Sequence, residues 1–305
     1  MKKQNRSVMI GHILGVFTAV IWGTTFISTK LLLGEMAPIE VLIYRFIAGY
    51  FVLALVCPKP LKFTGLKEEL WYLAAGLSGV TIYFLFENVA LTYTLAGNVG
   101  VIVSTAPMFT AILAFLFLKE ERPKKYFFLG FLVAMSGILL INYNGRVSMK
   151  LNPKGDFLAL GAAFVWAVYS IIIKKHLNMG ENMIASTRRI IFYGLISMIP
   201  FGFLMGFSFE PVKLMQPEVI GNLLFLSIGA TSICYIIWNW TVQELGAVKA
   251  SVYIYIVPVI TIVASAVFLG EIPGLVTITG AFLTIIGLLL SEKKDSVAEN
   301  KLLDK

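Results

Sequence analysis

The sequence predicts an all-α integral membrane protein with ten transmembrane helices, arranged as two inverted repeats of five helices each. Three observations lead to this fold class. Hydrophobic residues make up 58% of the 305 residues and charged residues only 14%, which is too little charge to cover a soluble protein of this size. Long uncharged runs recur along the whole chain. The second half of the chain also repeats bulky and polar residues of the first half in the same order.

The uncharged runs define the expected spans. A membrane helix needs about 20 apolar residues, because the hydrocarbon layer is about 30 Å thick. The uncharged run 88–118 is too long for one span, and the segment 94–98 divides it. The first run, 7–29, is too long for a signal-peptide core, so we interpret it as a retained span. The expected spans are 10–33, 37–57, 69–93, 98–118, 126–143, 156–176, 184–205, 218–243, 247–269 and 273–291.

Basic residues between the spans predict the orientation. With the N-terminus in the cytoplasm, 17 Lys and Arg residues lie on the cytoplasmic side and 5 on the other side. The positive-inside rule therefore predicts a multi-pass protein of the plasma (inner) membrane with both termini cytoplasmic. The bilayer also explains the net charge of +8, so no nucleic-acid partner is expected. Residues 292–305 are expected to form a disordered cytoplasmic tail.

An internal repeat links the two halves. The matching residues are Trp22 with Trp166 and Arg45 with Arg189 at an offset of 144, Asn88 with Asn239 and Pro107 with Pro258 at 151, and Gly130 with Gly280 and Gly137 with Gly287 at 150. The expected domains are residues 1–145 and residues 146–291, each with five spans. Because five is odd, the second repeat enters the membrane from the opposite side, which is typical of transporters. Duplication retained only for packing is the alternative.

Several motifs are similar to those of a known family. The run IWGTTF at 21–26, the run YRF at 44–46, and the segments around Pro107 and Pro258 resemble EamA-type members of the drug/metabolite transporter superfamily. The resemblance covers residues 10–291, so both domains read as EamA-type repeats. It implies a five-plus-five helix fold, a central cavity and secondary transport. Members of that family export amino acids, other metabolites or drugs, and some import, so the resemblance leaves the substrate open.

Motifs for other chemistry do not occur in the sequence. It contains no GxxxxGK[ST] phosphate loop, no HExxH or GxSxG motif and no Cys/His cluster. We therefore expect no enzymatic activity, no cofactor and no metal site. Transport would be driven by a gradient or be facilitated.

Ionisable residues inside the spans are functional candidates, because charge is costly in a membrane. Arg45 and Arg189 can attract a carboxylate or phosphate to a cavity, or can snorkel to the interface with structural hydrogen bonds. Glu87 can carry a coupling proton, can be a permanent partner of Arg45, or can lie at the membrane interface. Asn88 and Asn239 can bind substrate or join helices.

Aromatic and hydroxyl residues complete the candidate cavity. The further candidates for substrate binding are Trp22, Thr25, Tyr83, Trp166, Tyr169, Tyr235 and Trp238. The cavity is expected to be lined by the first four helices of each half, because the fifth and tenth spans carry almost no polar residues. Pro107 and Pro258 are candidate hinges, since each proline frees a backbone carbonyl; simple helix shape is the alternative.

These features favour a secondary transporter that moves a small metabolite by alternating access, most readily an amino acid or related compound in the direction of export. Its expected partners are a small-molecule substrate, the lipid bilayer and a candidate coupling proton, and the sequence does not indicate an oligomeric state. A lipid-linked carrier flippase and a membrane sensor or scaffold are the alternatives.

Overall fold

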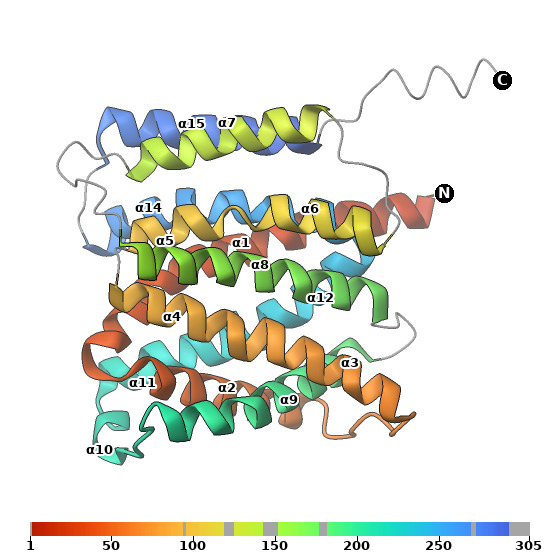
Figure 1. The fold of residues 1–305 in the computed structure, drawn as a ribbon, viewed down its shortest axis with the longest axis vertical. Helices are drawn as coiled ribbons and strands as arrows, with labels where there is room; N and C mark the ends of the chain where they lie inside the picture. Colours follow the sequence, from red (N-terminus) through yellow and green to blue (C-terminus); the bar gives the residue numbers. More distant parts are fainter. Residues whose placement is uncertain are drawn as a thin grey trace.

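The computed structural model describes residues 2–93, 96–118, 125–142, 152–176, 182–269 and 273–292, and most of these residues form helices. The α-helices are α1 (Lys2–Glu35), α2 (Pro38–Val56), α3 (Leu66–Gly76), α4 (Tyr83–Tyr93), α5 (Ala96–Val103), α6 (Ala106–Phe117), α7 (Lys125–Asn142), α8 (Pro153–His176), α9 (Met183–Leu204), α10 (Pro211–Leu214), α11 (Pro217–Leu224), α12 (Cys234–Leu245), α13 (Ala247–Ser251), α14 (Ile256–Leu269) and α15 (Leu275–Glu292). Figure 1 shows that they form one bundle, in which the chain runs back and forth between two ends.

Eight helical stretches among the described residues are long and apolar enough to cross a membrane. They are α1, α2, α3–α4, α5–α6, α8, α9, α11–α12 and α13–α14, and α7 and α15 are shorter apolar helices. Their bounds lie close to the spans expected from the sequence. Many large apolar side chains on their outer faces are exposed, including Leu55, Phe203 and Leu275. Such exposure suits a protein whose surroundings are lipid.

Four of the expected continuous spans are interrupted. The stretches α3–α4 and α11–α12 contain π-helical turns, η1 (Leu77–Ile82) and η2 (Phe225–Ile233). In the other two, the α-helix is interrupted shortly before a proline. Helix α5 ends before Pro107, and a 3₁₀ segment, η3 (Val252–Tyr255), precedes Pro258. Proline has no N–H to donate to the preceding turn, which explains the interruptions at these two positions.

Helices α7 and α15 pack along each other, antiparallel, at one edge of the bundle (Figure 1). Gly130 lies against the backbone of Gly287, and Gly137 lies against the backbone of Gly280. A Cβ atom at any of these four positions would collide with the backbone of the facing helix. Glycine therefore sets the close approach of the two helices.

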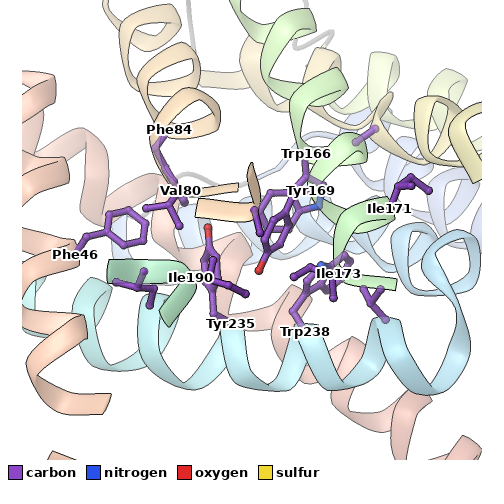
Figure 2. Close-up of a cluster of buried hydrophobic side chains, with 14 of the residues drawn as sticks. Phe46, Val80, Phe84, Trp166, Tyr169, Ile171, Ile173, Ile190, Tyr235 and Trp238 are labelled. Carbon is purple, nitrogen blue, oxygen red and sulfur yellow. The ribbon is translucent and has the colours of Figure 1, made fainter. Parts of the chain in front are cut away.

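The two ends of the described chain, Lys2 and Glu292, lie at the same end of the bundle (Figure 1). The expected disordered tail lies outside the described residues, apart from Glu292 at the end of α15. The core between the two halves is rich in aromatic side chains, with Phe46, Tyr169, Tyr235 and Trp238 almost fully buried (Figure 2).

Candidate functional site

A cavity lies in the centre of the bundle. It holds about 520 Å³ of space not occupied by protein atoms, counting its open side. None of its lining residues comes from α7 or α15. The lining residues are Trp22, Thr25, Phe26, Arg45, Tyr83, Phe84, Glu87, Val103, Trp166, Ile254 and Val257. Six of the residues that the sequence singled out thus meet here: Trp22, Thr25, Arg45, Tyr83, Glu87 and Trp166.

Arg45 supplies the positive charge of the cavity. It extends from α2 and is only 4% exposed. Its Nε donates a hydrogen bond of 2.7 Å to the Thr231 hydroxyl in η2. The guanidinium carbon lies 4.4 Å from the centre of the Phe84 ring and 5.4 Å from that of Phe46. These contacts hold the guanidinium at Nε and on one face. Among the described residues, no group accepts a hydrogen bond from its two Nη atoms.

Glu87 supplies the negative charge from α4. Its side chain is 7% exposed, and Tyr83, which lies one helical turn earlier in α4, lines the same cavity. Within the described part of the chain, no ion pair with an N–O distance of 4.0 Å or less joins Glu87 to Arg45. The cavity therefore contains two opposite charges that face the same space without a direct salt bridge.

Aromatic side chains form the walls. The ring centres of Trp22 and Trp166 lie 5.2 Å apart at 83°, and those of Tyr83 and Trp166 lie 4.9 Å apart. Trp22 Nε1 donates to the Ala230 carbonyl at 3.3 Å. Trp166 Nε1 has no acceptor among the described residues, although Trp166 is only 4% exposed.

A packed layer lies directly behind the tryptophans. Trp238 contacts both Trp22 and Trp166, at ring distances of 5.0 and 5.7 Å. The Tyr169 hydroxyl donates to Asn239 Oδ1 at 2.6 Å, and the Tyr235 hydroxyl donates to the Gly79 carbonyl at 2.6 Å. Figure 2 shows Trp166, Tyr169, Tyr235 and Trp238 between the helices, and their ring planes are tilted or edge-on to one another. The four candidates that support the cavity from behind and do not line it are Tyr169, Tyr235, Trp238 and Asn239.

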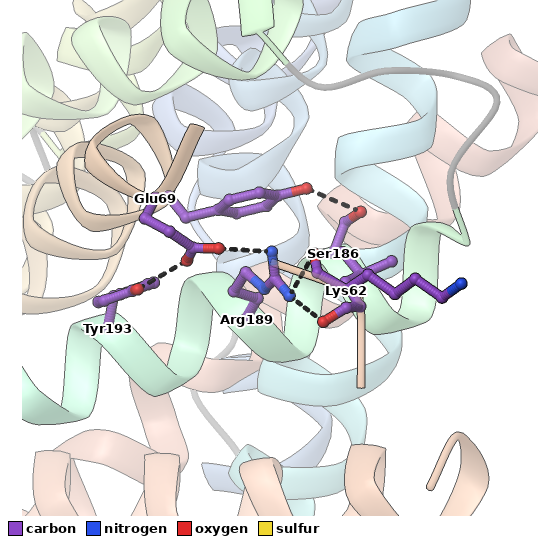
Figure 3. A network of polar contacts seen from close by, with 7 residues as sticks. Lys62, Glu69, Ser186, Arg189 and Tyr193 are labelled. Atoms are coloured by element: carbon purple, nitrogen blue, oxygen red, sulfur yellow. Dashed lines mark hydrogen bonds and ion pairs between the residues drawn. The ribbon is translucent and has the colours of Figure 1, made fainter. Parts of the chain in front are cut away.

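Arg189 lies apart from the cavity, in a polar network between α3, α9 and the segment that precedes α3 (Figure 3). Its Nη1 forms an ion pair of 2.8 Å with Glu69 Oε1, and the Tyr193 hydroxyl donates to the other carboxylate oxygen at 2.6 Å. Its Nη2 donates to the carbonyl oxygens of Leu61 and Lys62. Both oxygens of the Glu69 carboxylate and both Nη atoms of Arg189 thus have a hydrogen-bond partner.

Asn88, the remaining candidate, is buried beside the cavity but does not line it. Its Oδ1 has no hydrogen-bond partner among the described residues. Five lining residues were not predicted as such, because apolar residues occur at most positions of every span: Phe26, which was noted only as part of a family motif, Phe84, Val103, Ile254 and Val257. Thr231, which accepts the hydrogen bond from Arg45, could not be identified either, because hydroxyl residues occur in many of the spans.

The cavity is displaced toward one end of the bundle. Its residues on α1, α2 and α4 lie nearer to the end at which α1 ends and α2 begins, opposite to Lys2 (Figure 1). The packed layer of Tyr169, Tyr235 and Trp238 lies on the other side of the two tryptophans. The fold and this site define a helical membrane protein with an internal binding cavity.

Comparison with known proteins gives the family. The model of the EamA-like transporter family matches residues 9–143 and again residues 153–292, and the chain belongs to this family. The repeated match agrees with the resemblance seen in the motifs. The family is one of transporters, so the chain is a multi-pass membrane transporter and its family name does not indicate an enzyme.

Individual relatives align over nearly their whole length. An uncharacterized transporter of Archaeoglobus fulgidus is 32% identical over 93% of this chain and 97% of its own. A probable terminal-alkyne amino-acid exporter of Streptantibioticus cattleyicolor is 24% identical, with 92% of each chain covered. A solved crystal structure shares the fold with a TM-score of 0.70 at 18% identity, covering 93% of this chain and 96% of that one.

Proposed function

We propose that this protein is a secondary transporter that carries a small metabolite, an amino acid or related compound, out of the cell by alternating access. The observation that carries the proposal is the central cavity, in which a buried arginine and a buried glutamate face the same space. Buried charge in a membrane protein is costly, and it is retained where it serves transport.

Reciprocal contacts support an inverted arrangement of two five-span repeats. Gly130 contacts Gly287, and the residues that match them in the repeat, Gly280 and Gly137, contact each other in turn. Such a crossed pattern is expected for antiparallel helices related by a two-fold axis. With α7 and α15 counted as spans, the repeat gives ten transmembrane helices.

Hydrogen bonds at the two ends of the bundle show the same crossed pattern between residues that match in the repeat. The Tyr44 hydroxyl donates to the Ser208 carbonyl, and Arg188 donates to the Cys57 carbonyl. The offset of 144 matches Tyr44 with Arg188, and the offset of 151 matches Cys57 with Ser208. An interface built from equivalent contacts can adopt two arrangements of similar energy, one open to each side.

The cavity residues of the first half and the residues that match them in the second half, here called the two half-sites, differ in exposure. This difference supports alternating access. The repeat matches the lining residues Thr25 and Tyr83 with Tyr169 and Cys234. Tyr169 and Cys234 are fully buried in the packed layer. We interpret the structure as the state open to the outside, with both termini in the cytoplasm and Pro107 and Pro258 as hinges for the exchange.

Glu87 is the proposed site of a coupling proton. Its carboxyl lies in the cavity without a direct salt bridge within the described residues, so a proton and a cationic group can compete for it. A permanent electrostatic partnership with Arg45 remains the alternative. Export of an amino acid follows the printed name of the Streptantibioticus cattleyicolor relative.

Counterflow into proteoliposomes tests the proposal. Vesicles preloaded with single unlabelled metabolites, including amino acids, amines and organic acids, are expected to accumulate the labelled form of at least one amino acid. Loss of the dependence on a pH gradient in Glu87→Gln would support proton coupling. Movement of a fluorescent phospholipid between leaflets without exchange of any metabolite would contradict transport and favour a flippase.

A further inference from the structure

We infer that Arg45 and Glu87 together recognise the zwitterionic backbone of an α-amino acid, and that the aromatic wall takes an apolar side chain. The inference rests on the proposed function, since it names the chemistry of the substrate in the same cavity. It also assigns each charged group of the cavity to one group of the ligand: the guanidinium to the carboxylate and the carboxylate to the ammonium.

The held orientation of Arg45 suits a carboxylate. Thr231 accepts from Nε at 2.7 Å, and the Phe84 ring covers one face of the guanidinium at 4.4 Å. The two Nη atoms remain available to a ligand, since no described residue accepts from them. Arginine binds carboxylates through two parallel N–H···O bonds, and a guanidinium fixed in advance loses little freedom on binding.

The carboxyl of Glu87 suits an ammonium group. It comes from α4, whereas Arg45 comes from α2, so the two charges reach the cavity from different helices. Tyr83 lines the cavity beside Glu87 and brings a hydroxyl group to the same part of the wall. A primary ammonium has three donors and can bond both the carboxyl and a neighbouring hydroxyl or carbonyl.

The separation of the two charges is the decisive feature. Their nitrogen and oxygen atoms lie more than 4.0 Å apart, wider than a salt bridge, so neither group neutralises the other directly. A ligand that bonds to both, at about 2.8 Å for each charge-assisted bond, requires such a gap. A ligand with one charge leaves the other protein charge buried and unpaired, which is strongly unfavourable.

The rest of the cavity determines the side chain of the ligand. Trp22, Phe26, Trp166, Ile254 and Val257 are apolar or aromatic. They offer no further charge for an acidic or basic side chain. An aliphatic or aromatic amino acid therefore fits both the charged and the apolar part of the site, and amino acids with charged side chains are disfavoured.

A ligand series on the purified full-length protein tests the inference by isothermal titration calorimetry. L-leucine carries both charges, 4-methylpentanoate only the carboxylate, and 3-methylbutylamine only the ammonium. We expect L-leucine to bind about tenfold or more tightly than either analogue. L-phenylalanine is expected to bind like L-leucine, and L-glutamate and L-lysine to bind more weakly.

Variants connect each charge with its ligand group. Glu87→Gln is expected to weaken L-leucine binding about tenfold or more and to leave 4-methylpentanoate binding as tight or tighter, because no unpaired carboxylate then faces it, whereas Arg45→Gln is expected to weaken both. Glu218→Gln, the same substitution at an exposed residue at the start of α11, is the control and should bind L-leucine as the wild type does. A melting curve of each variant establishes that it is folded.

Each of the following outcomes would overturn the inference: no binding of L-leucine or L-phenylalanine to the wild type, equal affinity for L-leucine and a singly charged analogue, or an unchanged preference in Glu87→Gln. Tighter binding of glycerophosphoethanolamine than of L-leucine would also overturn it and would indicate a lipid headgroup. Failure of the proposed function looks different, because L-leucine would then bind with the expected preference and show no counterflow in proteoliposomes.

Discussion

Arg45 and Arg189 occupy matching positions of the repeat, yet their surroundings differ. Arg45 lies in the cavity with its two Nη atoms free of partners among the described residues, and Glu87 faces it without a salt bridge. Arg189 forms a direct ion pair with Glu69 and bonds two backbone carbonyls. The acids also differ in origin, since the repeat matches Glu87 with Trp238 and Glu69 with Ile220.

The comparison teaches that the two repeats place an arginine at equivalent backbone positions, and that the residues around each arginine then give it a different role. In the first half, Arg45 and Glu87 have no ion-pair partner among the described residues, and we propose that a ligand pairs with both. In the second half, the guanidinium of Arg189 instead joins α9 to α3 and to the segment before α3 (Figure 3). The following predictions separate these two roles.

The largest effect is expected for Arg45→Gln in transport. Loss of the guanidinium removes a charge-assisted bond to the ligand, worth about 1.5–3 kcal/mol, so counterflow of the substrate should fall about 10- to 100-fold. The measurement is initial uptake into proteoliposomes at matched protein density. Arg189→Gln is the matched control, and an equal loss of uptake in both folded variants would remove the distinction between the two arginines.

A double-mutant cycle on Arg189→Gln and Glu69→Gln tests the structural role of the second arginine. Both side chains are mostly buried, at 14% and 11% exposure, so each single variant leaves an unpaired charge and should lose about 2 kcal/mol of stability. The double variant should lose less than the sum of the two. The measurement is thermal unfolding in detergent micelles, and strictly additive losses would show that the ion pair contributes nothing.

An exchange of small residues between the two halves gives a smaller effect. The repeat matches Gly79 with Ala230, and a Cβ atom at Gly79 would collide with the Tyr169 ring. Gly79→Ala should therefore cost about 1–2 kcal/mol of stability through overpacking, more than Ala230→Gly. The melting temperatures of the two variants show which substitution costs more stability. The reverse order would show that the packed layer has room to spare.

The smallest effect is expected at an exposed ion pair. Lys213 lies 3.0 Å from Glu210 and lowers the pKa of that carboxyl by hydrogen bonding and by its charge. Because the pKa is lowered in the folded state, any stabilisation is present above the ordinary pKa of a glutamate and is lost as the pH falls below it. Both side chains are partly open to solvent, at 33% and 47% exposure, so Lys213→Ala should leave the melting temperature unchanged at pH 7 and at pH 4. A clear decrease at pH 7 alone would show a larger role for the pair.

Much of the fold follows from the sequence, because a membrane fixes the length and polarity of each span. The expected bounds lie close to the observed helices, and Trp22, Arg45 and Glu87 were singled out because polar and bulky residues are rare inside spans. The π-helical turns were missed, since they arise from packing across the interface, where Thr81 and Ser232 donate to backbone carbonyls of the facing helices.

The position of Arg189 was beyond the reach of the sequence for a similar reason. The repeat predicts equivalent backbone positions, but it does not predict which acid each arginine meets. Glu69 lies near the start of α3, where an acidic residue is typical of any helix N-terminus, so nothing in its local sequence marks it as a partner of Arg189.

The central claim is that the two half-sites are exposed to opposite sides of the membrane in turn. Thiol labelling of oriented vesicles with an impermeant maleimide tests it directly. Thr25→Cys, in a chain with Cys57→Ser and Cys234→Ser, probes the cavity; native Cys234, in a chain with Cys57→Ser alone, probes the packed layer. We predict that the Thr25→Cys thiol reacts only from the external side, and that Cys234 reacts only from the cytoplasmic side and faster during transport. Reaction of both thiols from the same side would contradict the account.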